Sequence, residues 1–314
     1  MEIDEKRMTV GWIGAGRMGF ALAQRLIDAD YDVSVYNRTR SKAEPLAARG
    51  AKIVDSPAGL ADRDVVFIMV SASDDLEAVT IGEGGLLTTS MKPQVIVDSS
   101  TVSATVSTKI RGLANDKGTA FLAAPVSGSP KVVDAGKLTL AVSGPRDAFD
   151  QVEHLLVELG RGVTYVGDDE VARIVKICHN VFLGVVTQSL AEITVLAEKA
   201  GVSRADFLAF LNDSVMGSTF TRYKSPAFVN LDFTPSFTPV LLRKDFDLGL
   251  ETAREHGVAM PVAALAAELV TAVIGAGHED EDFATLLLEQ ARRSDMELTS
   301  EDVDVDDGLG RTDG

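Results

Sequence analysis

A glycine-rich turn directly follows the first β-strand that the sequence predicts. Met8–Ile13 has the pattern of a buried strand, and it runs into Gly14-Ala15-Gly16-Arg17-Met18-Gly19 and then into an amphipathic helix. In that context Gly14 makes the tight turn, Gly16 lets the backbone approach a pyrophosphate, and Gly19 lets helix and strand pack closely. The free N–H groups at the start of the helix would face the anion. The sequence therefore predicts a dinucleotide-binding turn that opens a βαβ unit.

The first half of the chain alternates short β-rich runs with helical patterns, which is typical of a parallel sheet built from βαβ units. Strand patterns stop after Gly167, and long apolar-periodic helical segments follow, so we place a domain boundary near residue 168. The predicted strands are Met8–Ile13, Asp32–Tyr36, Val65–Val70, Val95–Asp98, Ala120–Ala124, Leu138–Val142 and Gly162–Val166. The predicted helices include Arg17–Asp28, Ala148–Leu159, Val171–Ala200, Arg204–Asn212, Leu241–His256 and Val262–Ala276, punctuated by Gly201, the Pro226–Pro239 stretch and Pro261.

The negative charge is concentrated at the end of the chain. The net charge is −17, and from Glu279 onward thirteen acidic residues stand against three arginines. We therefore expect three parts: a dinucleotide-binding domain over 1–168, an all-α domain over 169–298, and a disordered, acidic, solubilising tail over 299–314. A strongly acidic chain with one Trp is a poor candidate for nucleic-acid binding.

The composition indicates a cytoplasmic protein. The hydrophobic fraction is 46%, and no uninterrupted apolar run approaches the roughly 18 residues of a membrane span. The charged start differs from a signal peptide. Cys178 is the only cysteine, which suits a reducing compartment, and the four histidines show no spacing with acids or thiols that predicts a metal site. We expect no metal and no membrane partner.

The second predicted strand ends in a basic turn. Asn37-Arg38-Thr39-Arg40-Ser41-Lys42 carries three cations, and no acid lies between Asp32 and Glu44. An acid at this place would accept hydrogen bonds from the ribose of NAD, whereas cations favour the 2′-phosphate of NADP, to which Asn37 and Thr39 would add neutral hydrogen bonds. We predict NADP (NADPH) as the preferred cofactor, with NAD possible. The alternative is a solvated basic turn.

A lysine interrupts an apolar helical segment, Ile174–Val186. Lys176 and Asn180 lie four residues apart and so share one helical face. One interpretation is a solvated stripe, which Arg173 would extend by one turn. The stripe would then continue at Leu183 and Gly184, which are not polar. The other interpretation is a site lysine, because an ammonium in an apolar wall is costly unless it has a partner or a use.

Five motifs in order give the chain a family resemblance. They are the glycine turn, Asp98-Ser-Ser-Thr-Val-Ser103, Ala124-Pro-Val-Ser-Gly128, Lys176-x-x-x-Asn180 and Lys244-Asp245. Over residues 8 to 298 the chain resembles the β-hydroxyacid dehydrogenases, which include 3-hydroxyisobutyrate dehydrogenase and the glyoxylate/succinic-semialdehyde reductases. The resemblance implies an α/β, doubly wound, Rossmann-like sheet, followed through a long interdomain helix by an all-α domain that helps form homodimers or homotetramers.

The resemblance also implies roles for individual residues. Lys176 would be catalytic, and Asn180 would hold the substrate hydroxyl and position the ammonium. Ser127 and Gly128 would bind the substrate carboxylate. Members of the family often carry a second glycine where this chain has Ser129, whose hydroxyl indicates an extra polar group or a different anion on the substrate. On the cofactor side the resemblance implies Thr101 at the nicotinamide, Met69, Val70 and Ser71 in the cleft, and Lys244 from the second domain.

Each of these assignments has a structural alternative. Ser127–Pro130 has the composition of an ordinary turn, Lys244-Asp245 fits the wet side of an amphipathic helix, and Thr101 could cap the helix that begins near Ser103. The function we predict is NADP-dependent interconversion of a small anionic 3-hydroxyacid and its semialdehyde or oxoacid by hydride transfer, with a lysine as general acid/base. The alternatives are an imine reductase, in which a lysine at this place is not typical, and a protein that binds NADP without turnover.

Overall fold

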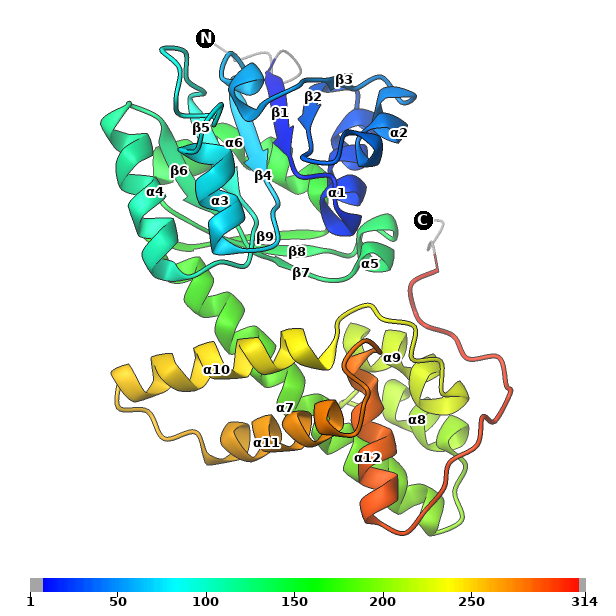
Figure 1. Ribbon diagram of the computed structural model, residues 1–314. Helices are drawn as coiled ribbons and strands as arrows, with labels where there is room; N and C mark the ends of the chain where they lie inside the picture. The colour runs from blue at the N-terminus through cyan, green and yellow to red at the C-terminus, as the bar shows by residue number, and fades with distance from the viewer. Residues whose placement is uncertain (1–7, 311–314) are drawn as a thin grey trace. The chain divides into compact units, whose positions relative to one another are not determined.

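The computed structural model describes residues 8–310, and the chain divides between Lys176 and Ile177 into two compact units (Figure 1). The strands of the first unit are β1 (Thr9–Ile13), β2 (Asp32–Tyr36), β3 (Lys52–Ile53), β4 (Val65–Ile68), β5 (Val95–Asp98), β6 (Ala120–Ala123), β7 (Val126–Ser127), β8 (Thr139–Ser143) and β9 (Gly162–Gly167). Its helices are α1 (Arg17–Asp28), α2 (Glu44–Ala47), α3 (Ser73–Thr80), α4 (Ala104–Asp116), α5 (Pro130–Asp134) and α6 (Arg146–Leu159).

The strands form one nine-stranded sheet in the order β3-β2-β1-β4-β5-β6-β8-β7, with β9 paired to β8. The sheet is parallel from β3 to β6, as the alternating pattern predicts. It differs from a wholly parallel sheet at β8, which runs antiparallel to β6 and β7 and parallel to β9. β3 and β7 are each two residues long, too short for a residue pattern to predict.

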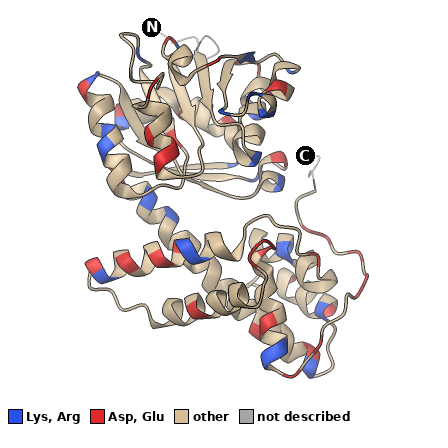
Figure 2. Ribbon diagram, viewed as in Figure 1, with Lys and Arg blue, Asp and Glu red and all other residues tan. Residues whose placement is uncertain are grey.

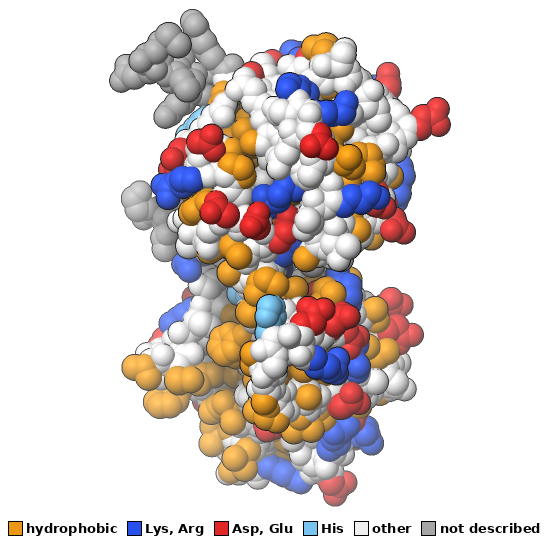
Figure 3. All heavy atoms as spheres, turned by 90° about the vertical axis from the view of Figure 1, so that its left-hand side faces the viewer, with side chains coloured by type: hydrophobic (Ala, Val, Ile, Leu, Met, Phe, Trp, Pro, Cys, Tyr) orange, Lys and Arg blue, Asp and Glu red, His pale blue; other side chains and the backbone are white. Residues whose placement is uncertain are grey.

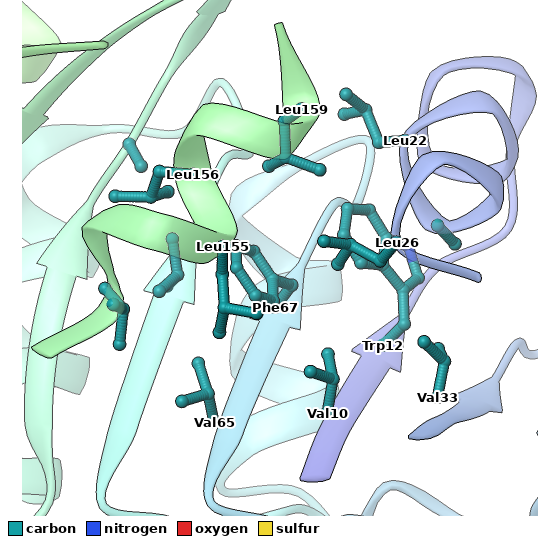
Figure 4. Close-up of a cluster of buried hydrophobic side chains, with 14 of the residues drawn as sticks. Val10, Trp12, Leu22, Leu26, Val33, Val65, Phe67, Leu155, Leu156 and Leu159 are labelled. Carbon is teal, nitrogen blue, oxygen red and sulfur yellow. The ribbon is translucent and has the colours of Figure 1, made fainter. Parts of the chain in front are cut away.

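Both faces of this sheet are buried. On one face Trp12 stacks on Phe67 with ring centroids 5.3 Å apart, and Leu26 of α1 and Leu155 of α6 cover them (Figure 4). The other face carries a second apolar cluster, in which α3 and α4 cover alternate residues of the same strands. Burial on both faces explains why these strands are continuous apolar runs. The predicted doubly wound α/β architecture is confirmed.

The second unit is helical. Its helices are α7 (Val171–Lys199), which begins in the first unit, α8 (Arg204–Asp213), α9 (Thr219–Asn230), α10 (Pro239–Glu255), α11 (Pro261–Gly275) and α12 (Leu286–Arg293). α7 and α10 approach closely at two glycines. A Cβ at Gly184 would lie 2.5 Å from the Phe246 ring, and one at Gly249 would lie 2.4 Å from Val181. Gly184 therefore interrupts the apolar segment for a packing reason.

The path of α9 differs from the prediction. α9 runs through Pro226, at a place where the proline-rich stretch predicts a break. Ser218 and Thr221 form a reciprocal capping box that starts this helix, and the apolar residues after the proline are buried. The cap and this burial stabilise a helix whose interior proline removes one backbone hydrogen bond.

The predicted disordered tail differs from the structure over residues 299–310, and 311–314 lie outside the described residues. Glu301 accepts hydrogen bonds from the backbone N–H groups of Arg204 (2.7 Å) and Ala205 (3.0 Å) at the start of α8. The Asn230 amide donates to the Val303 carbonyl at 2.8 Å, and Leu309 is buried. The segment carries several acids (Figure 2). One of them complements a helix N-terminus, an interaction that composition does not reveal.

By length and composition α7 could cross a membrane, and within residues 8–310 it is the one helix that meets this test. Its most apolar window has a mean hydropathy of 1.4, and 50% of that window is buried. Core helices of water-soluble proteins have the same properties, so this is only a weak indication of a membrane span.

Candidate active site

The three glycines of the turn after β1 are needed for different reasons. Gly14 has φ +98°, and a Cβ there would lie 2.1 Å from the Met69 carbonyl oxygen; a Cβ at Gly19 would lie 2.0 Å from the Gly14 carbonyl oxygen. These two glycines are required by the fold. Gly16 has an ordinary φ of −68°, and a Cβ there would meet nothing within 4 Å. The open space at Gly16, at the start of α1, is what the close approach of a pyrophosphate requires.

A hollow of about 640 Å³ adjoins this turn. Its lining includes Gly16 and Arg17 from the glycine turn, Lys42 from the basic turn, and Pro130 at the start of α5. The structure thus brings together two segments that the sequence assigns to cofactor binding, the glycine turn and the basic turn, and places the start of α5 beside them. A phosphate at the start of α1 would have the Lys42 ammonium nearby in the same hollow.

The basic turn has partners within the first unit. Asn37 accepts a hydrogen bond from the Ala15 N–H (2.8 Å) and donates to the Thr39 carbonyl (2.8 Å), so its amide ties the turn to the glycine loop. The Arg38 side chain is 83% exposed and lies 2.8 Å from the Asp75 carboxylate. Solvent around such an exposed pair weakens the attraction, so Arg38 can exchange Asp75 for a phosphate at small cost.

The carboxyl ends of β1, β4 and β5 meet beside the glycine turn. The Met69 N–H donates to the Ile13 carbonyl, and the Val70 N–H donates to the Ser100 hydroxyl at 2.9 Å. Met69, Val70 and Ser71 therefore lie between the glycine turn and the loop that carries Thr101. That edge of a parallel sheet is where such folds bind ligands.

The cap of α4 is Ser103, whose hydroxyl accepts from the Val106 N–H at 3.3 Å. The structural alternative for Thr101, that it caps this helix, is therefore excluded. Thr101 itself is half-buried.

The segment assigned to the substrate carboxylate is a strand followed by a sharp turn. Ser127 ends β7, where it pairs with Thr139 of β8. Gly128 has φ +146°, and a Cβ there would lie 2.8 Å from Val132 and 2.9 Å from Leu138. Ser129 then precedes α5 without capping it through its side chain. Glycine is thus required at 128 by backbone and space, and the Ser129 hydroxyl is not used by the helix.

The interpretation of Arg173 as part of a solvated stripe is wrong. Its side chain is 3% exposed and lies 2.5 Å from Asp98, at the end of β5, and 2.8 Å from Glu170. A helical periodicity does not distinguish a buried, paired arginine from a solvated one, so no residue pattern indicates this cluster. The contacts also explain why the division into units falls inside α7 rather than near residue 168, since they hold the first turns of the helix to the sheet.

Two residues of the family motifs meet in the helical unit. Asn180 on α7 is buried, and its amide donates to the Asp245 carboxylate on α10 at 2.5 Å. His179 Nδ1 lies 2.9 Å from the Asn180 carbonyl oxygen. Lys244, with its side chain 44% exposed, lies 3.9 Å from Asp245. Lys176 is the last residue of the first unit, one turn before Asn180 on the same helix. Asp245 stands in the Lys244-Asp245 motif, and sequence reasoning gave it no role; the structure shows that it accepts the hydrogen bond from Asn180.

Metal chemistry has no candidate site in the part of the chain that the structure describes. Among residues 8–310, no group of three or more His, Cys, Asp or Glu side chains could hold a metal ion.

Comparisons with known proteins identify the family. Residues 9–167 match the family model described as the NAD binding domain of 6-phosphogluconate dehydrogenase, and residues 171–289 match the NAD-binding model of NADP-dependent 3-hydroxyisobutyrate dehydrogenase. The chain is 31% identical to 2-(hydroxymethyl)glutarate dehydrogenase of Eubacterium barkeri, over 91% of this chain and 96% of that protein. It is 30% identical to glyoxylate/succinic semialdehyde reductase 2 of Arabidopsis thaliana, over 89% and 78% of the two chains.

A solved structure shares the fold. 3-Hydroxyisobutyrate dehydrogenase from Salmonella typhimurium superposes with a TM-score of 0.79 at 23% identity, over 90% of this chain and 99% of that chain. The two family models together cover both units, with the glycine turn in the first match and the Lys176–Asn180 segment in the second. The chain therefore belongs to the β-hydroxyacid dehydrogenases, NAD(P)-dependent oxidoreductases that act on the CH–OH group of small hydroxyacids.

Proposed function

We propose that this protein interconverts a small 3-hydroxyacid and its semialdehyde or oxoacid, with NADP as the preferred cofactor and Lys176 as the general acid/base. One observation carries the proposal. Lys176 lies one turn after Arg173, whose side chain donates to the Ser100 carbonyl at 2.9 Å, and Ser100 directly precedes Thr101. The turn that bears the amine is thus anchored to the strand end at which we expect the nicotinamide.

The residue types fit the chemistry. A bound nicotinamide dinucleotide supplies or accepts the hydride at the substrate carbon. In the reductive direction the Lys176 ammonium gives a proton to the substrate oxygen and stabilises its developing negative charge, and in the oxidative direction the neutral amine takes the proton back. Asn180, oriented by Asp245, hydrogen-bonds the substrate hydroxyl.

The substrate we propose is a small anion. Ser127 and the Gly128 N–H would bind a carboxylate, and the Ser129 hydroxyl, which does not cap α5, would bind a second polar group. The relatives are named for glyoxylate, succinic semialdehyde, 2-(hydroxymethyl)glutarate and 3-hydroxyisobutyrate, so these compounds are the first to assay.

The preference for NADP rests on the turn after β2. It carries Arg38, Arg40 and Lys42 and has no acid between Asp32 and Glu44. Lys42 shares the hollow with the glycine turn, and Arg38 is exposed. Cations at this place favour the 2′-phosphate of NADP, while NAD stays a possible second cofactor.

We further propose a cytoplasmic homodimer or homotetramer that does not bind a membrane. Hydrophobic side chains gather on one side of the helical unit (Figure 3). Its exposed apolar residues include Phe182, Leu196, Phe210, Met216 and Leu265. Large exposed apolar patches mark interaction surfaces. Light scattering coupled to size-exclusion chromatography measures the oligomeric state, and a monomer at micromolar concentration would contradict this part of the proposal.

Two other functions remain for comparison. An imine reductase shares architecture and NADPH use, but a lysine at position 176 is not typical of it. A protein that binds NADP without turnover would have no need for Ser127, Lys176 and Asn180 together. Activity on cyclic imines alone would favour the first alternative, and tight NADPH binding without any turnover would favour the second.

The test follows nicotinamide absorbance with both cofactors over hydroxyacids, semialdehydes and cyclic imines. Lys176→Ala should lower turnover by roughly 10²- to 10⁴-fold, the usual contribution of general acid–base catalysis, with NADPH affinity preserved. Lys109→Ala, at an exposed lysine on α4 paired with Glu77, is the matched control and should turn over like the wild type. Unchanged turnover in Lys176→Ala would remove the lysine mechanism.

A further inference from the structure

We propose that Arg173 is a positioning residue that holds the Lys176-bearing turn of α7 against the Thr101 loop. Arg173 makes three directional contacts within the first unit. Its Nη2 donates to Asp98 (2.5 Å), its Nη1 to the Ser100 carbonyl (2.9 Å) and its Nε to Glu170 (2.8 Å). The inference rests on the proposed function, in which Lys176 and Thr101 act on the same reaction centre.

Ser100, the residue before Thr101, has a hydrogen-bond partner at its backbone N–H, its carbonyl and its hydroxyl. Asp98 is fully buried, and its second oxygen accepts from the Ser100 N–H at 3.1 Å. Arg173 donates a hydrogen bond to the Ser100 carbonyl, and the Ser100 hydroxyl accepts one from the Val70 N–H. The path of the chain into Thr101 is therefore set by the Asp98–Arg173 pair.

A planar guanidinium is suited to this task. Its N–H groups point in fixed directions, so three partners on two chain segments become mutually positioned, which a lysine ammonium on a flexible stem does not achieve. Buried ion pairs contribute little net stability compared with apolar packing, and their best-supported use is to select one arrangement over others. The arrangement selected here joins the end of β5 to the first turns of α7.

The same cluster supplies a matched control. Arg111 on α4 also pairs with Glu170 (2.8 Å), and it donates to the backbone carbonyls of Phe121 and Asp169. Arg111 is buried like Arg173, with 8% and 3% of the two residues exposed. Its hydrogen bonds go to residues other than Asp98 and Ser100, so losing it disturbs the ion cluster while leaving the β5 contacts of Arg173 in place.

The experiment compares Arg173→Met, Arg173→Lys and Arg111→Met in the full chain. Arg173→Met should lower kcat roughly 100-fold, the size of effect expected when reacting groups are misplaced by about 1 Å. KM and the NADPH dissociation constant should stay within about threefold of wild type. Arg173→Lys should give a kcat between those of the wild type and Arg173→Met. Arg111→Met should lower the unfolding temperature but keep kcat within about threefold of the wild-type value. Equal loss of kcat in Arg173→Met and Arg111→Met, or wild-type kcat in Arg173→Met, would overturn the inference.

Hydrogen exchange separates this inference from the proposed function. Amide protection over residues 99–103 should fall in Arg173→Met and stay at the wild-type level in Arg111→Met, whether or not the protein turns over any assayed substrate. Absence of turnover in the wild type would contradict the proposed function alone. Unchanged protection in Arg173→Met would contradict the positioning role alone. If Arg173→Met does not fold, both comparisons are made with Arg173→Lys. In that case, protection over residues 99–103 and a kcat that match those of the wild type and of Arg111→Met would contradict the inference.

Discussion

The carboxylate of Asp245 on α10 accepts a hydrogen bond from the side-chain amide of Asn180 on α7, at 2.5 Å, and both side chains are buried. This contact determines which end of the Asn180 amide faces which neighbour, since the opposite end, its carbonyl oxygen, lies 2.9 Å from His179 Nδ1. A residue that is to hold a substrate hydroxyl gains from such an orientation, because its geometry is set before the substrate arrives.

Removing the Asp245 carboxylate should therefore lower both stability and turnover. Asp245→Ala leaves the buried Asn180 amide without this acceptor, which costs about 1–3 kcal/mol of unfolding free energy, measured by urea denaturation. We expect kcat to fall roughly 10- to 100-fold, with NADPH affinity unchanged. Asp247→Ala is the control on the same helix, since Asp247 is 57% exposed and paired with Arg243. A wild-type kcat in Asp245→Ala would show that the orientation of Asn180 is not needed.

Much of the fold follows from the sequence because periodicity and burial agree. The bounds of β2, β5 and α1 are those predicted, since alternating valines mark β2, an apolar run marks β5 and a clear apolar face marks α1. What the patterns miss is set by contacts between distant residues. α9 continues through Pro226 because a capping box and buried neighbours compensate. The segment at 299–310 contacts the start of α8 through Glu301.

The sequence predicts a candidate site residue only where its role depends on its immediate neighbours in the chain. Gly14 and Gly128 have positive φ, which a turn motif predicts. Arg173 has no such local sign, because its role depends on Asp98, 75 positions away. The same holds for Asp245, whose partner Asn180 lies on another helix. Composition and periodicity describe faces of elements, and they carry no information about which polar residues pair across them.

Gly16 offers a test of cofactor binding that leaves the fold intact. Its backbone is in a region open to all residues, and a Cβ would meet nothing within 4 Å. Gly16→Ala should therefore fold like the wild type but weaken NADPH binding by roughly 10-fold or more, because the methyl group occupies the space that the pyrophosphate approaches. Gly14→Ala is the contrasting variant, with a Cβ 2.1 Å from Met69, and should unfold at lower temperature. Equal NADPH affinity in wild type and Gly16→Ala, by fluorescence titration, would place the pyrophosphate elsewhere.

Arg38 should discriminate between the two dinucleotides. Arg38→Ala is expected to weaken NADP binding about 10-fold and to change NAD binding by less than about twofold, because only NADP carries the 2′-phosphate. Asp75→Asn should strengthen NADP binding, since it removes the carboxylate that now holds Arg38 at 2.8 Å. Arg49→Ala, at an exposed arginine paired with Asp28, controls for a general loss of positive charge. An equal loss of affinity for both cofactors in Arg38→Ala would refute the assignment.

The stability of the helical unit should depend on pH through Glu289. Hydrogen bonds from Arg292 and then Arg293 lower the pKa of this 5%-exposed carboxyl from 4.5 to about 2. Because the folded pKa lies below the unfolded one, the stabilisation is complete above pH 4.5 and is lost as the pH falls toward 2. Solvent around the two arginines reduces the effect to about 1–2 kcal/mol.

Urea denaturation should show that Glu289→Gln is less stable than the wild type at pH 7 and equally stable near pH 2. Asp150→Asn, which removes an exposed pair with Arg146, should show no measurable difference at either pH. A gap between Glu289→Gln and wild type that does not change with pH would mean that the lost contribution is packing rather than charge.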